Sequence, residues 1–317
     1  MLTNLAIITT LRCDLKCQHC LRGFPKERPD FPMEMLDKLL TEAMPFGAKH
    51  VALTGGEPHL HPNFEKIVEK IVAYGYSWHF VSHGQRTEPY LPSMERYKDK
   101  VTHVTLSIDG ATAETHDEIR QRKGAFEKVT ASARKYVELG YKVRVSSTLN
   151  RKNKSEVEAL LNLAQDIGAS YMNFGGTIPT PWNQDLVLND GESLELVQQI
   201  TTLREKSGFD VQHFSSLHTR GGVNFCNVLN LRELTFNSLG ELIFCCDTIE
   251  NGAVTGSLRE HSFAEFVKLW LAQSNSLQAQ RAEQIATGNL GEKFDTCAFC
   301  NSHFTADYLN SMSQLTQ

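Results

Sequence analysis

The sequence predicts an α/β protein, with an open, partial (β/α)6 barrel followed by a smaller C-terminal α+β domain. Between residues 5 and 176, short β-rich runs alternate with amphipathic stretches whose apolar residues recur every three or four positions. This alternation is typical of a parallel sheet with helical crossovers, and six such units are two fewer than a closed barrel needs. Beyond residue 208 a strand-like hairpin and further helices replace the pattern, which indicates a second domain.

The elements of the barrel follow in order along the chain. The expected strands are Leu5–Thr10, His50–Thr54, Trp78–Ser82, His103–Ile108, Lys142–Thr148 and Tyr171–Phe174. The expected helices between them are Met33–Met44, Asn63–Tyr74, Ala125–Leu139 and Lys154–Ile167. In such folds the chemistry gathers at the carboxyl ends of the strands, so residues that directly follow a strand are the candidate site residues.

The C-terminal part has its own pattern. The turn signal Asn237–Gly240 joins the strand-like runs Leu234–Phe236 and Leu242–Phe244. Helices are expected before and after this hairpin, at Glu192–Lys206, Phe263–Gln273 and Ser276–Ile285. We expect a barrel domain at residues 1–215 and a second domain at residues 216–317, with the boundary near Gly221 and Gly222.

Composition excludes several classes of protein. The chain has 317 residues, of which 41% are hydrophobic and 22% charged, as in an ordinary globular protein. Its net charge of -5 gives no reason to expect a nucleic acid or an anionic membrane as partner. Because it has neither an apolar run long enough to cross a bilayer nor a secretion signal, we expect a cytoplasmic location.

The eight cysteines fall into two groups, one at Cys13, Cys17 and Cys20 and the other at Cys226, Cys245, Cys246, Cys297 and Cys300. In a chain without a secretion signal, this grouping favours metal or redox chemistry over disulfides. The three thiolates of the first group can bind three irons of a cubane cluster, which leaves the fourth iron open to a chelating ligand. A zinc site completed by His19 or by a distant residue is the alternative.

The segment Cys13-x3-Cys17-x2-Cys20 directly after the first strand, together with Thr54-Gly-Gly-Glu-Pro58 after the second, resembles the radical S-adenosylmethionine (radical SAM) enzymes. Two glycines after a strand by themselves more often indicate only a turn. The resemblance is specific because the glycine segment and the cysteine segment follow two successive strands. The resemblance implies a [4Fe-4S] cluster on the three cysteines, with SAM bound to the open iron. It also implies that Gly55, Gly56 and Glu57 receive the methionine amino group, and glycines let a backbone approach a ligand closely.

The same resemblance suggests further SAM contacts. Ser107 and Asp109 end the fourth strand, where the family contacts the methionine or the ribose, although an aspartate-capped turn explains Asp109 by itself. Ser147 and Asn150 end the fifth strand and are expected near the ribose, with a core-facing hydroxyl as the alternative for Ser147. His83 stands where relatives carry asparagine, and its role is left open.

The second cysteine group resembles a twitch domain, the shortened form of the SPASM module. Its expected ligands are Cys226, Cys245, Cys297 and Cys300, which would hold one auxiliary [4Fe-4S] cluster. From spacing alone, a zinc ribbon is the alternative. No cysteine follows Cys300, so a second auxiliary cluster is not expected.

Cys246 is the cysteine that neither cluster needs. It is either an inert buried residue or a catalytic residue that gives a hydrogen atom to a substrate radical, as in radical peptide epimerases of similar layout. Asp247 next to it is either a base that accepts a substrate proton or a solvated turn carboxylate.

The resemblance implies an enzyme that cleaves SAM reductively to a 5'-deoxyadenosyl radical and removes a hydrogen from its substrate. We expect a peptide substrate that undergoes epimerisation, crosslinking or oxidation in ribosomal-peptide maturation, with electrons from a donor such as flavodoxin or ferredoxin. The chain begins twelve residues before Cys13, so no fused leader-binding domain is expected and a small metabolite such as an amino sugar remains an alternative. A non-catalytic iron–sulfur electron carrier and a zinc-stabilised binding module are the non-enzymatic alternatives; the SAM-binding segments argue against the carrier.

Overall fold

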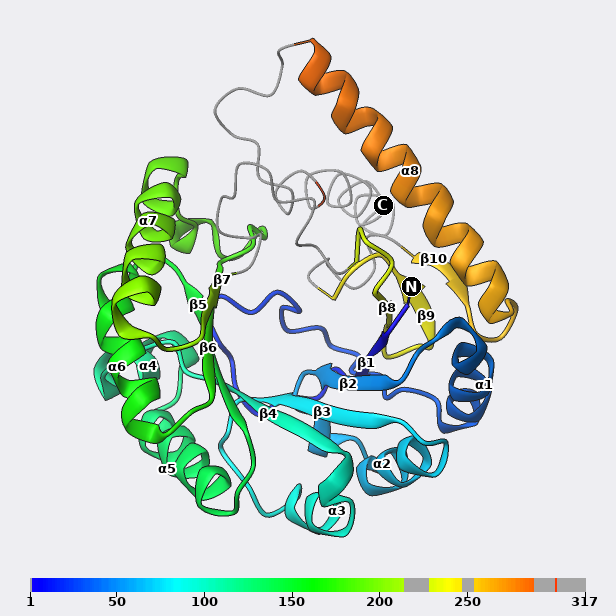
Figure 1. The fold of residues 1–317 in the computed structure, drawn as a ribbon, viewed down its shortest axis with the longest axis horizontal. Helices are drawn as coiled ribbons and strands as arrows, with labels where there is room; N and C mark the ends of the chain where they lie inside the picture. Colours follow the sequence, from blue (N-terminus) through cyan, green and yellow to red (C-terminus); the bar gives the residue numbers. More distant parts are fainter. Residues whose placement is uncertain (1, 214–227, 247–253, 288–299, 301–317) are drawn as a thin grey trace.

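The computed structural model describes residues 2–213, 228–246, 254–287 and 300. The strands are β1 (Asn4–Thr10), β2 (His50–Gly55), β3 (Ser77–Ser82), β4 (Val101–Ser107), β5 (Val143–Leu149), β6 (Tyr171–Gly176), β7 (Val211–His213), β8 (Glu233–Phe236), β9 (Glu241–Ile243) and β10 (Val254–Ser257). They form one sheet in the order β10-β9-β8-β1-β2-β3-β4-β5-β6-β7, which curves into an incomplete barrel (Figure 1).

The helices are α1 (Met33–Ala43), α2 (Phe64–Ala73), α3 (Leu91–Arg96), α4 (Ala113–Arg120), α5 (Ala125–Glu138), α6 (Val157–Ile167), α7 (Asp190–Ser207) and α8 (Phe263–Ala286). Helices α1 to α7 surround the convex face of the sheet (Figure 1). Neighbouring strands from β1 to β7 are parallel, because a helical crossover returns the chain to the same end of the sheet each time. The predicted α/β partial barrel is confirmed.

The main hydrophobic core lies between the strands and the surrounding helices. Strand residues such as Ile7, Leu53 and Phe80 have no exposed surface and pack in one cluster with the apolar faces of the helices. Each fully buried side chain of this size contributes about 1.5–3 kcal/mol. Side chains alternate along a strand, so the residues between these point to the concave face, where the cavity described below is found.

Two helices and one strand of the barrel were not predicted. Helix α4 buries only His116, Ile119 and Arg120, so it lacks the apolar stripe that reveals a helix in a sequence. Its N-terminus is capped by Thr112, whose hydroxyl oxygen accepts a hydrogen bond from the backbone nitrogen of Thr115. Helix α3 and strand β7 are short and carry few apolar residues.

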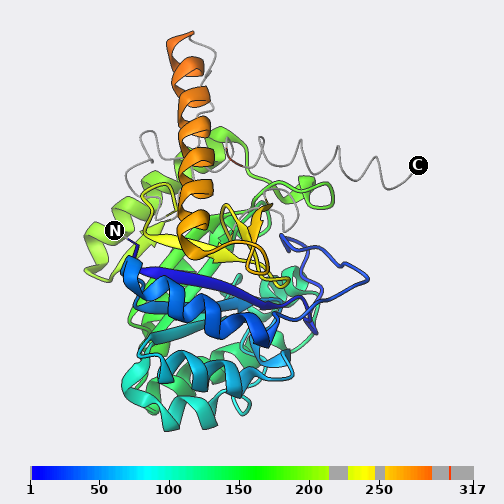
Figure 2. The same cartoon turned by 90° about the vertical axis from the view of Figure 1, so that its right-hand side faces the viewer.

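The prediction of two C-terminal helices, Phe263–Gln273 and Ser276–Ile285, is wrong, because α8 continues through both segments. The polar residues between them do not break the helix: Ser274 is buried, and Leu277 one turn later joins the hydrophobic core. Serine is only a moderately poor helix former, which a buried face can outweigh. Figure 2 shows the end of α8 extending away from the barrel.

The predicted hairpin is present as β8 and β9, which are antiparallel. Its turn is held by Asn237, whose Oδ1 accepts hydrogen bonds from the backbone nitrogens of Leu239 and Glu241 at 3.0 and 2.9 Å. Strand β8 also pairs in parallel with β1, from Asn4 opposite Glu233 onward, so the hairpin extends the barrel sheet. The predicted division between residues 215 and 216 lies outside the described residues and stays a prediction.

Among the described residues, the structure contains no helix that is both long and apolar enough to cross a membrane.

Candidate functional site

A cavity of about 550 Å³ occupies the concave side of the sheet. At the carboxyl ends of the strands its wall includes Cys13, Cys17, Cys20, Gly55 and Gly56. The first cysteine group and the glycines after β2 therefore meet at one place, as their positions after neighbouring parallel strands predict.

The loop at residues 11–32, which carries the three cysteines, is fastened by side chains that bond to its backbone. Arg28 donates from Nη1 to the carbonyl oxygen of Cys13 at 3.0 Å. Trp182, in the segment after β6, donates from Nε1 to the carbonyl oxygen of Cys20 at 2.9 Å. These two hydrogen bonds hold the backbone of the loop at Cys13 and Cys20, which both lie on the cavity wall.

Gly55 and Gly56 are required by the close approach of this loop to the end of β2. A Cβ on Gly55 would overlap the carbonyl oxygen of Thr10, and one on Gly56 would overlap that of Arg12. Gly55 also has a φ of 139°, which favours glycine. The sequence argument assigned these glycines to a ligand, and the structure adds that they also fit the cysteine loop against β2.

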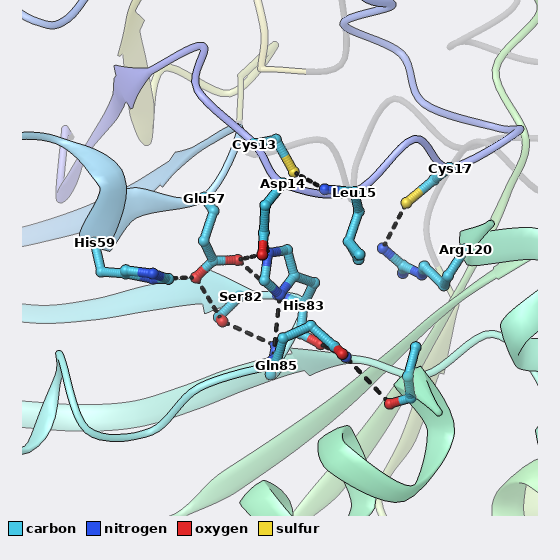
Figure 3. Close-up of polar contacts among 12 residues, drawn as sticks. Cys13, Asp14, Leu15, Cys17, Glu57, His59, Ser82, His83, Gln85 and Arg120 are labelled. Carbon is cyan, nitrogen blue, oxygen red and sulfur yellow. Dashed lines mark hydrogen bonds and ion pairs between the residues drawn. The ribbon is translucent and has the colours of Figure 1, made fainter. Parts of the chain in front are cut away.

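The carboxylate of Glu57 is fully buried and is occupied by hydrogen bonds (Figure 3). It accepts from Ser82 Oγ at 2.7 Å and from the backbone nitrogen of His83 at 3.0 Å, and Tyr90 donates its hydroxyl to the same group. Burial by itself would raise the pKa of Glu57, but His83 and the hydrogen bonds from His59 and Tyr90 hold it below its usual value. Glu57 is not part of the cavity wall, so this segment presents the glycine backbone to the cavity.

His83, whose role the sequence leaves open, lies between two carboxylates. Its Nε2 is 2.8 Å from Asp14 Oδ1 and 3.1 Å from Glu57 Oε2. The hydrogen bond from His83 lowers the pKa of Asp14, which also pairs with Arg122 at 3.2 Å. His83 thereby ties the cysteine loop to the end of β3, and it also forms part of the cavity wall.

Asp109 connects the cysteine loop to α4 and β5. Its carboxylate lies 2.7 Å from His19 Nε2 and 2.6 Å from Arg120 Nε, and it accepts a hydrogen bond from the backbone nitrogen of Thr148 at 2.8 Å. Burial would raise the pKa of Asp109, but Arg120 and His19 hold it well below its usual value. Asp109 is fully buried and is not part of the cavity wall, so it is a positioning residue in this structure.

Arg120 places a buried positive charge beside a cysteine of the loop. Its Nη1 donates to Cys17 Sγ at 3.6 Å (Figure 3). Burial raises the pKa of the Cys17 thiol, and the charge of Arg120 opposes that rise. A cationic donor aimed at sulfur suits a thiolate better than a neutral thiol, so the residues present fit the thiolate-ligated cluster expected from the sequence.

Of the three other residues expected to contact SAM, one lies on the cavity wall and two do not. Ser107 lies on the cavity wall, and its contact with SAM stays a prediction. Ser147 is buried on the helix side of β5, which is the core-facing alternative, while its neighbour Ser146 lies on the wall. Asn150 is buried in a turn, where its Oδ1 accepts from the backbone nitrogen of Lys152 at 2.9 Å and its Nδ2 donates to the carbonyl oxygen of Thr148 at 3.1 Å.

The C-terminal cysteines are described in part. Cys246 lies on the cavity wall, and Arg22 donates from Nη2 to its carbonyl oxygen at 2.8 Å. Cys245 and Cys300 pack against the hydrophobic core. Cys226, Cys297 and Asp247 lie outside the described residues, so the expected auxiliary site stays a prediction.

Two residues of the site were missed at the sequence level. Arg120 lies 103 residues from Cys17, and nothing nearby in sequence links the two. Ser146 could have been found, because alternation along β5 puts it on the same face as Thr148 and opposite to Ser147.

The sequence and the fold are both similar to those of known proteins. The sequence matches the Radical SAM superfamily over residues 7–180. It is 25% identical to the mycofactocin maturase MftC of Mycobacterium tuberculosis over 301 residues, covering 91% of this chain and 75% of the relative. It is 27% identical to the PqqA peptide cyclase of Methylorubrum extorquens over 204 residues, covering 62% of this chain and 53% of the relative, so it spans about half the length of that protein.

Among solved structures, Streptococcus suis SuiB bound to its precursor peptide SuiA has a similar fold. The TM-score is 0.70 at 13% identity, and the match covers 84% of this chain and 64% of SuiB. At that identity the likeness concerns the fold.

Proposed function

This chain belongs to the radical SAM superfamily, and from that membership we propose that it is an enzyme that uses SAM to modify a peptide. The observation that carries the proposal is the meeting of Cys13, Cys17, Cys20 and the Gly55-Gly56 backbone around one cavity. Three clustered thiols and an adjoining ligand space are what a cluster with one open iron needs.

Cys13, Cys17 and Cys20 would hold the [4Fe-4S] cluster. When bound, the cluster supplies one electron to the sulfonium of SAM, which releases methionine and a 5'-deoxyadenosyl radical that removes a hydrogen atom from the substrate. The electron comes from an external donor such as flavodoxin or ferredoxin. The role of the protein is to aim the reactants and to keep water away from them.

The residues around the cavity divide this work. The Gly55-Gly56 backbone receives the methionine amino group, and Ser107 bonds to the methionine or the ribose. Arg120 stabilises the thiolate of Cys17 through its charge-assisted hydrogen bond at 3.6 Å. Asp109 holds Arg120 and His19 in place through its buried carboxylate.

A peptide is the proposed substrate because two similar proteins act in that kind of pathway. One is named a maturase and the other a peptide cyclase, and the first is similar over 91% of this chain. The modification is an epimerisation, a crosslink or an oxidation. An amino sugar or another small metabolite is the competing substrate.

The C-terminal part is proposed to be a twitch domain at residues 216–317. Cys226, Cys245, Cys297 and Cys300 would ligate one auxiliary [4Fe-4S] cluster, which positions the substrate or takes an electron from it. Cys246 is proposed as the hydrogen-atom donor to the substrate radical, since it belongs to the wall of the same cavity as Cys13. The thiyl radical left on Cys246 would be reduced back to the thiol by an electron from the external donor and a proton.

The test is the formation of 5'-deoxyadenosine from SAM by the anaerobically reconstituted and reduced protein. Cys17→Ala should abolish it and should lose iron corresponding to one cluster. Arg134→Gln changes an exposed residue on the outer helix α5 and should leave both unchanged. A wild-type protein that binds zinc, or that forms no 5'-deoxyadenosine when fully reduced, would refute the proposal.

A further inference from the structure

The cavity extends from the cysteines to the opposite end of the barrel. Its wall includes His50, the first residue of β2, as well as Gly55, the last residue of the same strand. A strand rises about 3.3 Å per residue, so five steps span about 16 Å. The inner end of the cavity, formed by the amino ends of the strands, is therefore separate from the cysteine end, where the proposed function places SAM.

The inner end of the cavity is polar and carries an arginine, Arg144. Arg144, the second residue of β5, forms no ion pair with any described residue, and its buried Nε has no hydrogen-bond partner. Its guanidinium lies over the ring of Tyr171, 4.5 Å from the ring centre. Glu233, the acidic residue at this end of the cavity, has contacts of its own and no ion pair with Arg144.

Three histidines line the wall beside this arginine. His50 Nε2 lies 2.6 Å from His79 Nδ1, and the rings of His79 and His103 stack with their centres 4.1 Å apart. Burial, together with nearby Arg144, lowers the pKa of His50 to about 4 and that of His103 to about 3. The histidines are therefore neutral at physiological pH, and they do not compete with Arg144 for an anion.

Further polar atoms at this end have no partner within the described part of the chain. They are His103 Nε2, Thr105 Oγ1 and Asn173 Oδ1, and all three residues belong to the cavity wall. Buried polar atoms are costly when unpaired, so a cluster of them around the unbonded Nε of Arg144 indicates a place for a polar ligand.

We propose that this inner end binds a carboxylate of the substrate, with Arg144 as its cationic partner. A carboxylate matches the planar donor fork of arginine and would occupy the unpaired Nε. The inference rests on the proposed peptide substrate, which can supply the group either as its C-terminus or as an aspartate or glutamate side chain.

The position of Arg144 also predicts a spacing. Arg144 lies four residues before Thr148, whose backbone bonds to Asp109 beside the cysteine loop, and this corresponds to about 13 Å along β5. An extended peptide covers that distance in about four residues. At a rise of about 3.3 Å per residue, the carboxylate should therefore lie about three or four residues from the residue that loses its hydrogen.

The test uses short peptides and the reconstituted protein with SAM but without a reductant. N-acetyl-tetraalanine with a free carboxylate is compared with its C-terminal amide, and N-acetyl-Ala-Ala-Asp-Ala amide with the same peptide carrying Asn. Binding is measured by calorimetry at constant ionic strength. We expect at least one acid to bind about tenfold or more tightly than its neutral partner. The first pair reports a C-terminal carboxylate and the second a side-chain carboxylate.

Arg144→Gln should remove that preference, Arg144→Lys should retain part of it, and Arg134→Gln should leave it unchanged. The comparison of acid with amide in the wild-type protein needs no variant, so it is decisive even if Arg144→Gln fails to fold. Equal binding of acids and neutral partners by the wild type, or an unchanged preference in Arg144→Gln, overturns the proposal. Formation of 5'-deoxyadenosine is measured separately, so failure of the carboxylate site is distinguishable from failure of the proposed function.

Discussion

At the scale of single residues, Gly56 shows how tightly the cysteine loop fits against β2. Gly56→Ala should displace the loop, because the new Cβ would overlap the carbonyl oxygen of Arg12. We expect loss of most of the N-terminal cluster, measured as iron content and as visible absorbance after reconstitution. In Gly191→Ala the new Cβ makes an ordinary contact of 3.4 Å, so full iron content is expected there. A Gly56→Ala protein with a full cluster would contradict this account.

Cys246 allows a second test at this scale. If its thiol gives a hydrogen atom to the substrate radical, Cys246→Ala should keep its clusters and its cleavage of SAM while product formation falls to background. The measurement is the ratio of modified substrate to 5'-deoxyadenosine. Unchanged turnover in the variant would mean that Cys246 is an inert wall residue.

Single residues also show how far the sequence predicts the site. The spacing of Cys13, Cys17 and Cys20 is local in sequence, so it could be recognised without a structure. The Asp109–Arg120–Cys17 contacts depend on how α4 packs against the loop, and no local pattern reports that packing. Ser147 was chosen by resemblance, although the alternation along β5 favours Ser146 for the cavity wall.

At the scale of elements, the histidines on β2, β3 and β4 make the stability of the barrel depend on pH. His50 and His103 have folded pKa values of about 4 and about 3, and that of His79 is well below 6.5, while unfolded histidine titrates near 6.5. Below pH 6.5 the unfolded chain therefore binds protons that the folded chain does not. The free energy of unfolding should decrease as the pH falls from about 6.5 to 4.

Urea unfolding at pH 7 and pH 5 measures this effect. His79→Gln should lose less stability between the two pH values than the wild type. Glutamine does not titrate, so the variant lacks the proton that His79 binds at pH 5 only in the unfolded chain. Loss of the cluster in acid would affect both proteins equally. The difference between their changes in the free energy of unfolding therefore reports the contribution of His79. The same loss in both would show that the histidines do not control it.

The elements were predicted unevenly, for a physical reason. Strands β1 to β6 and the helices with an apolar stripe were recognised because burial on one face leaves a period in the sequence. The buried face of helix α4 includes a histidine and an arginine that contact the site, so the helix lacks a periodic pattern of apolar residues. In α8, Ser274 resembled a break although it is buried within a continuous helix.

At the scale of the whole molecule, the pairing of β1 with β8 joins the C-terminal hairpin to the barrel. Trp78 lies in the barrel core and Trp270 in α8, and both are almost fully buried. Two variants that retain only one of these tryptophans, with the others replaced by Phe, should show the same urea midpoint by fluorescence. Coincident midpoints are the mark of cooperative unfolding. An earlier midpoint for Trp270 would mean that α8 and the barrel unfold separately.

The sequence identified the hairpin but not its partner strand. Turn chemistry at Asn237–Gly240 is local, whereas the pairing with β1 joins segments that are 229 residues apart. Pairing between such distant strands cannot be predicted from either segment, because each shows only that it is apolar.

The same pairing affects how the protein is made. During translation β1 leaves the ribosome well before β8, so one of its edges has no partner until β8 has been synthesised. An unpaired strand edge on a nascent chain is a site where other chains can add, so we expect the growing barrel to depend on chaperones more than its size would suggest. The cysteine loop is synthesised before β8, so its three thiols are available before the sheet is complete.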